Sequence, residues 1–272
     1  MNKVKTHFRN IVLIAIVIIT SINGNAQLPD TEPELPKVSH AEPLYFDLVR
    51  DLGARKGEKE LNIGADFTNN SDYNAYSLLV EYEFAPVNRL GLEAEADFSL
   101  FKSTGNTKTP NNKLQCLRLS AQYSLFVSPE YRTTLAIGYS QLIEFTDFKS
   151  YGKRQLITGV SYNPFFVAAK RWGNNFHTLM YVGPVFEYDF TQKTTIVNWQ
   201  INTAFHYTIP HSSHFIGVEL NKEINQGKLE MTVRPQVKIK LNQNLGIGFV
   251  TGFPINKKCQ GFSSFFRIIY EP

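Results

Sequence analysis

The chain has 272 residues, of which 43% are hydrophobic and 13% aromatic, and its formal net charge is +4. Its two cysteines, Cys116 and Cys259, are too few for a disulfide framework or a cysteine metal cluster. Three of the excess positive charges lie within the first ten residues, so the charge balance excludes an argument for nucleic-acid binding.

Residues 1–26 have the pattern of a secretory signal peptide. A basic start is followed by the unbroken apolar run 11–19 and by the small residues Gly24-Asn25-Ala26 at the expected cleavage site. Removing this leader lowers the formal charge from +4 to +1. The sequence therefore predicts a secreted protein, with an uncleaved membrane anchor as the alternative.

Residues 27–42 contain three prolines and few apolar side chains, which predicts an extended periplasmic linker. Within the next stretch, 43–58, the spacing of the leucines predicts a short amphipathic helix that starts at Pro43 and closes at Gly53. Three placements are compatible with it: a plug inside a barrel, the inner leaflet interface, or a periplasmic handle for a partner. We expect it at the periplasmic mouth, through the residues Leu44, Asp47, Leu48, Arg50, Asp51 and Leu52.

Residues 59–272 alternate between apolar and polar side chains in about twelve segments of roughly 10–16 residues. Soluble strands average about 5–6 residues, whereas a tilted strand needs about 9–11 to cross a hydrocarbon core. The expected fold is therefore an all-β, antiparallel transmembrane β-barrel, with a soluble periplasmic sandwich as the alternative. Aromatic residues near the strand ends fit the girdles of such barrels: Tyr82, Phe84, Tyr123, Phe126, Trp172 and Tyr207.

The connections alternate in length, as they do in outer-membrane barrels. Short ones are expected at Pro86–Asn88, Ser128–Glu130, Arg171–Asn174, Pro210–Ser213 and Asn242–Asn244. Longer ones are expected near Asn69–Asn74, Ser103–Asn112, Thr146–Lys153, Asn221–Gly227 and Asn256–Gln260, and the link at Thr191–Lys193 breaks the rule. With an even strand count, both ends of the barrel chain lie on the periplasmic side. Pro235 interrupts a strand and predicts a bulge or local distortion.

Two stretches carry a family resemblance: HAEPLYFDLVRDLGARKGEKELNIG at 40–64 and LLVEYEFAPVNRLGLEAEADF at 78–98. They resemble a family of Gram-negative, Bacteroidetes-type outer-membrane β-barrel proteins, whose members sometimes bear the name phosphoribosylformylglycinamidine synthase. The resemblance implies an outer-membrane location and a barrel, and it supplies no catalytic residues. The chain shows no glycine-rich phosphate loop that would suit the enzyme of that name.

Charged side chains on the polar face of the strands fall into two groups. The acidic wall comprises Glu81, Glu83, Glu93, Glu95 and Asp97. The basic wall comprises Arg118, Arg234, Lys238, Lys240 and Arg267. Opposite walls would set a transverse field across a water-filled bore and select solutes by charge. The alternative is that they meet in a narrow lumen as buried ion pairs.

The sequence predicts no catalytic residue, metal site or cofactor. His211 and His214 fall in a short turn without a third ligand, and His177 and His206 lie on the lumen side without a nearby serine. Cys116 and Cys259 are compatible with a disulfide or with two free thiols.

The expected function is a narrow channel for small polar or charged solutes in the cell outer membrane. A closed structural or interaction barrel is the first alternative, and a lipid-acting enzyme the second. The expected partners are outer-membrane lipid, lipopolysaccharide and a small polar solute, without nucleic acid.

Overall fold

The computed structural model describes residues 35–46, 48–105, 109–255 and 260–272. The predicted signal peptide, the first half of the predicted linker, Asp47 and Cys259 lie outside the described residues. Among the residues that are described, no helix is both long and apolar enough to cross a bilayer.

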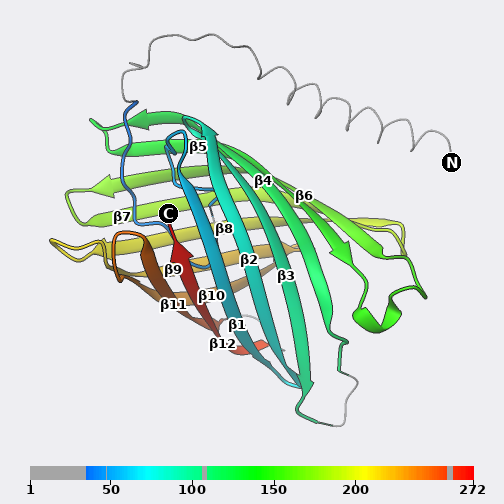
Figure 1. Ribbon diagram of the computed structural model, residues 1–272. Coiled ribbons are helices and arrows are strands. Elements are labelled where there is room, and N and C mark those ends of the chain that lie inside the picture. Colours follow the sequence, from blue (N-terminus) through cyan, green and yellow to red (C-terminus); the bar gives the residue numbers. More distant parts are fainter. Residues whose placement is uncertain (1–34, 47, 106–108, 256–259) are drawn as a thin grey trace, which may run out of the picture. The chain divides into compact units, whose positions relative to one another are not determined.

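Twelve antiparallel strands close into a barrel in which each strand pairs with its sequence neighbours and β12 pairs with β1 (Figure 1). This confirms the predicted barrel and strand number. The strands are β1 (Lys59–Asn70), β2 (Tyr73–Val87), β3 (Leu90–Ser103), β4 (Lys113–Ser128), β5 (Thr133–Phe145), β6 (Ile157–Trp172), β7 (Phe176–Asp189), β8 (Thr194–Thr208), β9 (Phe215–Asn225), β10 (Lys228–Lys240), β11 (Leu245–Pro254) and β12 (Gln260–Tyr270). A single turn of 3₁₀ helix, η1 (Phe148–Ser150), lies between β5 and β6.

The alternation in the sequence becomes an outer apolar face and an inner polar face. On β1, Leu61 and Ile63 point outward and are 37% and 42% exposed, whereas Glu60 and Asn62 point inward and are buried. Successive side chains of a strand lie on opposite faces, so this pattern repeats around the barrel. The outer face therefore has the chemistry of a surface that contacts lipid.

The five predicted short connections all lie at the end of the barrel where β1 begins and β12 ends. At the other end lie the longer stretches between β3 and β4, of which residues 106–108 are outside the described part, and between β5 and β6. The long connection predicted near Asn256–Gln260 falls on residues 256–259, which the structure does not describe. The long loops predicted near Asn69–Asn74 and Asn221–Gly227 are wrong, because β1–β2 and β9–β10 are tight hairpins there. Gln226 and Gly227 both have positive φ, 49° and 79°, which is the backbone of a two-residue hairpin turn.

The distortion predicted at Pro235 takes the form of a gap in one ladder. Pairing between β10 and β11 skips Arg234 and Pro235, while the pairs Val233–Phe253 and Gln236–Val250 keep one register on either side. A proline has no N–H to give to that ladder, so the neighbouring strand loses a partner without slipping.

The predicted helix is wrong for the described residues of 43–58, which form bends and turns. Arg50 and Gly53 adopt left-handed backbone conformations, with φ of 60° and 78°, and these interrupt a helical path. The N–H of Leu52 binds the Glu42 carboxylate and the N–H of Gly53 binds Ser124 Oγ, where a helix would bind its own carbonyls.

Candidate functional site

The described residues of 35–58, called the lumen segment below, lie against the inner face of the barrel. Leu44, Leu48 and Leu52 are 2%, 3% and 1% exposed. Phe46, Leu48, Val49 and Leu52 pack against one side of the interior, formed by Ala136, Phe165, Val167, Ala169, Leu179, Tyr181 and Ala204. Ala41 and Leu44 pack against Phe215, Val250, Phe265 and Ile269. The apolar side chains of the segment are thus buried inside the barrel, as the plug placement anticipates.

A carboxylate from β9 holds the backbone of the lumen segment. Glu219 is fully buried, and its Oε1 accepts hydrogen bonds from the N–H groups of Leu44 and Tyr45 at 2.8 and 3.0 Å. Its Oε2 accepts from the N–H of Phe46 at 3.2 Å, and Gln236 Oε1 accepts from Leu44 at 2.9 Å. Three consecutive N–H groups therefore converge on one anion, where hydrogen bonds are stronger than between neutral groups.

Arg50 inserts its guanidinium among carboxylates at the start of the barrel. Arg50 is 4% exposed, and its Nη1 lies 2.5 Å from Glu60 Oε2 and 3.9 Å from Glu83 Oε2. Asp51 Oδ2 lies 3.3 Å from Nη2 of the same side chain. Burial alone would lower the pKa of Arg50, but Asp51, Glu60 and Glu83 raise it above its ordinary value. The guanidinium is therefore a fixed positive charge.

Lys37 joins the two ends of the lumen segment. Its Nζ lies 3.0 Å from Asp51 and 2.8 Å from Glu58. Burial lowers the pKa of Lys37, but these two carboxylates outweigh that effect and raise it. Burial raises the pKa of Asp51, and Arg50 and Lys37 together bring it below its usual range. Glu42 closes the bend by accepting the N–H of Leu52 at 2.9 Å.

Two glycines of the strands make room for the segment. A Cβ added to Gly91 of β3 would lie 2.2 Å from the carbonyl oxygen of Val49 and 2.7 Å from Cβ of Arg50. A Cβ added to Gly248 of β11 would lie 2.9 Å from a methyl group of Leu44. The contact at Gly91 is with backbone and cannot be relieved by a rotamer change, so this position requires glycine while the segment is docked.

Histidines line the path of residues 40 and 41. His40 Nε2 lies 3.0 Å from Thr134 Oγ1, and its ring lies edge-on to that of His177 at 6.3 Å. His177 Nδ1 accepts the N–H of Ala41 at 3.2 Å. Burial, followed by His177 and Arg171, lowers the pKa of His40 to about 4. His206 also faces inward, 2.7 Å from the amide nitrogen of Gln236. The histidines weighed for lipid chemistry thus lie inside the barrel.

The structure brings part of the acidic and basic walls together in ion pairs between strands on the same side. Arg267 of β12 reaches across Gly64 of β1 to Glu81 of β2 at 2.6 Å. Arg118 of β4 lies 3.2 Å from Glu95 and 3.9 Å from Asp97 on the adjacent β3.

Other basic residues of the predicted wall have different partners. Arg234 lies 3.3 Å above the ring of Tyr45 and donates to Ser263 at 3.0 Å. Lys240 pairs with Glu271 near the chain's C-terminus. Lys238 is partly buried on the same inward face of β10. Two members of the predicted basic wall, Arg118 and Arg267, therefore form ion pairs with the acidic wall, whereas Arg234 and Lys240 contact other residues.

Two inward-facing glutamates were not predicted from the sequence. Glu219 lies in the alternating strand β9, and Glu60 is the second residue of β1. The one sequence signal that could have identified these two glutamates is their position in the alternating pattern, which places both side chains on the inward face of their strands. The sequence left Cys116 either in a disulfide with Cys259 or as a free thiol. Cys116 is a buried free thiol that donates to Asp97 Oδ2 at 3.1 Å, and Cys259 lies outside the described residues.

The chain belongs to the HAEPLYID-like family, which matches residues 36–271. The family name differs by one letter from residues 40–47 of this chain, HAEPLYFD, which lie in the lumen segment. No curated protein matches the sequence.

Solved structures of outer-membrane channels share the fold. An outer membrane channel from Pseudomonas putida F1 has 11% identity and a TM-score of 0.65, covering 85% of this chain and 100% of that chain. The NanC porin has 9% identity and a TM-score of 0.57, covering 78% and 99%. The KdgM porin in complex with disordered oligogalacturonate has 14% identity and a TM-score of 0.52, covering 77% and 98%. At these identities the likeness is one of fold.

Proposed function

We propose that this protein is an outer-membrane barrel that passes small polar or charged solutes, and that the lumen segment closes it in the state described. The observation that carries the proposal is the seating of residues 35–58 inside the barrel, on side chains that the strands point inward. The exposed apolar outer face and the shared fold with outer-membrane channels support the membrane location.

The orientation follows from the connections. The end that carries the five short connections also carries the entry to β1 and the exit from β12, and it corresponds to the periplasmic side. The longer connections 104–112 and 146–156 then face outward. The lumen segment enters from the periplasmic end and is covalently continuous with β1, so it can leave the lumen without leaving the protein.

The energetics favour a closed resting state. Burying a leucine side chain is worth about 1.5–3 kcal/mol, and the segment buries three. The polar anchors at Glu219 and Arg50 can exchange their partners for water when the segment leaves, because charged groups are well solvated in an aqueous lumen. Opening is thus expected to be infrequent and to need a trigger.

A closed structural barrel is the second candidate. It is favoured by the two apolar clusters, because side chains of the segment pack on opposite sides of the interior as they would in a permanent core. The channel and the closed barrel differ in one respect: in a channel, displacing the lumen segment opens a path through which ions can flow.

The test is single-channel recording of the full chain in planar bilayers beside Gly91→Val and Gly105→Val. The valine at 91 would clash with the backbone of the segment, whereas a Cβ at Gly105 meets nothing within 4 Å. A channel predicts rare openings in the parent and in the Gly105 variant and frequent, uniform steps in the Gly91 variant. Silence in all three, with material shown to be folded, would contradict a channel and support the closed barrel.

A further inference from the structure

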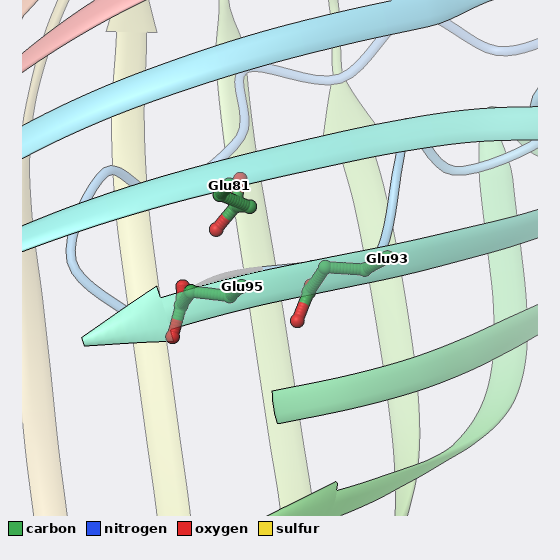
Figure 2. Close-up of side chains that lie close together, drawn as sticks. All are labelled: Glu81, Glu93 and Glu95. Carbon is green, nitrogen blue, oxygen red and sulfur yellow. The ribbon is translucent and has the colours of Figure 1, made fainter. Parts of the chain in front are cut away.

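The buried charges of the acidic wall have partners inside the barrel. Glu81 on β2 and Glu93 and Glu95 on β3, called the glutamate cluster below, project from the same face of the sheet (Figure 2). Glu81 accepts a hydrogen bond from Arg267 at 2.6 Å, and Glu95 lies 3.2 Å from Arg118. Glu93 accepts from a serine of β4 at 3.0 Å. The charges of this cluster are therefore met by the protein itself.

Arg234 of β10 is a buried cation without such a partner. It is 4% exposed, and in the part of the chain that the structure describes its guanidinium forms no ion pair and its Nε has no acceptor. It contacts the ring of Tyr45 at 3.3 Å and donates to Ser263 at 3.0 Å. Glu219, directly opposite in the ladder, binds backbone N–H groups of the lumen segment. A buried charge is costly unless it is paired, so this guanidinium is suited to an anionic group from outside the protein.

The strands are built around this guanidinium. A Cβ added to Gly252 of β11 would lie 2.4 Å from Arg234 Nη1 and 2.2 Å from Ser263 Oγ. Arg234 therefore passes β11 at a position without a side chain and reaches β12. Because strand residues fix the guanidinium, it would keep its place if the ring of Tyr45 moved away.

Asp66 of β1 supplies the opposite charge beside the same tyrosine. Its Oδ1 accepts from Thr68 at 2.9 Å, whereas its buried Oδ2 has no donor. Asp66 lies within electrostatic reach of Arg234 and of Tyr45, and it stands opposite Phe265, whose ring meets that of Tyr45 edge-on at 5.8 Å. A cation and a carboxylate, each with an unmet buried atom, thus lie around one aromatic ring without pairing with each other.

Tyr45 is the accessible side chain of the docked stretch. Of the described residues in 41–54 it alone is exposed, at 38%. Its ring meets Phe265 at the middle of β12, whereas the segment enters beside the end of that strand. A solute that arrives through the lumen from the far end therefore meets Tyr45, with the two opposite charges beside it.

We propose that Arg234 and Asp66 recognise a small zwitterionic solute, which binds where the ring of Tyr45 now lies. The carboxylate of the solute would pair with the guanidinium, whose planar fork matches a carboxylate in two parallel hydrogen bonds. The ammonium group would donate to Oδ2 of Asp66. A zwitterion meets both unmet atoms without changing the net charge of the interior, whereas a plain anion is repelled by Asp66 and Glu219 and a plain cation by Arg234.

This inference rests on the proposed function, because the solute reaches the site through the lumen. It names the class of solute and supplies a trigger for opening. A solute that takes the place of the Tyr45 ring binds the released segment better than the docked one, and a ligand with such a preference shifts the population towards release.

The test is calorimetric titration of the full chain, folded in detergent, with glycine and with γ-aminobutyrate, two zwitterions of short and long charge separation. Acetate and methylammonium, which each carry one of the two charges, are titrated at the same ionic strength. We expect one zwitterion per chain, bound roughly tenfold or more tightly than either single-charge probe. Arg234→Gln and Asp66→Asn should each weaken this binding by roughly tenfold or more.

Tyr45→Leu removes the ring that competes for the guanidinium and should tighten zwitterion binding by roughly tenfold. A purely structural Arg234 would give no such gain. Arg154→Gln, on the exposed connection between β5 and β6, is the matched control and should bind as the parent does. Three results would each overturn the site: no binding in the parent and in Tyr45→Leu, equal binding of zwitterions and single-charge probes, or unchanged binding in Arg234→Gln.

Single-channel recording with the same probes separates the two proposals. Calorimetric binding that is lost in Arg234→Gln, in protein that never conducts, would support the recognition site and contradict the channel. Openings that the zwitterions leave unchanged, in protein that shows no calorimetric binding, would overturn the recognition site and leave the channel standing.

Discussion

Arg50 is the charged anchor whose removal should release the lumen segment most effectively. In Arg50→Gln the guanidinium that meets Glu60 at 2.5 Å and Glu83 at 3.9 Å is lost, and its positive charge is removed from beside these two buried carboxylates. Removing one side of a buried ion pair costs about 3–5 kcal/mol. The barrel strands keep their ladders in this variant, so the cost falls on the docked state, in which those carboxylates stay dry.

At about 1.4 kcal/mol per tenfold change, this cost raises the ratio of released to docked segment by roughly a hundredfold to a few thousandfold. The assay is the rate of maleimide labelling at Ala41→Cys, a small residue that is 7% exposed while docked, with Cys116 and Cys259 replaced by serine. Under conditions where redocking is fast, the labelling rate follows the released population.

Arg154→Gln, on the exposed connection between β5 and β6, is the matched control and should label at the parent rate. Arg50→Lys keeps the positive charge, and its labelling rate should lie between that of Arg50→Gln and that of the parent. A labelling rate in Arg50→Gln within about threefold of the parent would refute the reasoning, because the ion pair would then contribute nothing to docking.

Two further perturbations address the other anchors. Glu219→Gln replaces the carboxylate that accepts three N–H groups with a neutral amide. At about 0.5–1.5 kcal/mol for each weakened hydrogen bond, the labelling rate at position 41 should rise by tenfold or more. Equal labelling rates in the variant and the parent would show that the charge of Glu219 is not needed for docking. The pKa of His40 is about 4 when docked and 6.5 when free, so the docked state binds fewer protons between these values; docking is then strongest above pH 6.5 and weakens as the pH falls towards 4. Labelling should rise about tenfold or more from pH 7 to pH 5, after correction for the thiol's own titration, and this rise should shrink in His40→Gln; a pH dependence unchanged by that substitution would contradict the assignment.

The barrel could be predicted because its pattern is local and repeated. Leu61 and Ile63 alternate with Glu60 and Asn62, and the same period continues through twelve strands. The loops near residues 71–72 and 226–227 were overestimated because polar residues there continue the ladder, and polarity alone does not separate a strand end from a loop.

The lumen segment could be predicted only in part. Its leucines are buried as the plug placement requires, but the same spacing suggested a helix that does not form. The choice was decided further along the segment, where Arg50 and Gly53 adopt left-handed backbone conformations and the N–H of Gly53 binds the distant Ser124 in place of a helix carbonyl. Tertiary partners of this kind leave no local signal in the sequence.

The glutamate cluster shows why register matters. The residues were predicted to face the lumen, but a plain tight turn pairing Val87 with Leu90 would set Glu81 opposite Ala96. A register shift between Phe84 and Val87 places Glu81 opposite Glu95. One irregular position therefore creates the cluster, and periodicity alone does not reveal it.

The central claim, that the lumen segment closes a solute path, is tested most directly by comparing the full chain with a form lacking residues 35–58, each refolded and recorded in planar bilayers under the same voltage. The account predicts long closed periods in the full chain and stable, uniform conductance steps in the shortened form. Equal conductance in both forms, or silence in both when each is shown to be a folded barrel, would contradict it.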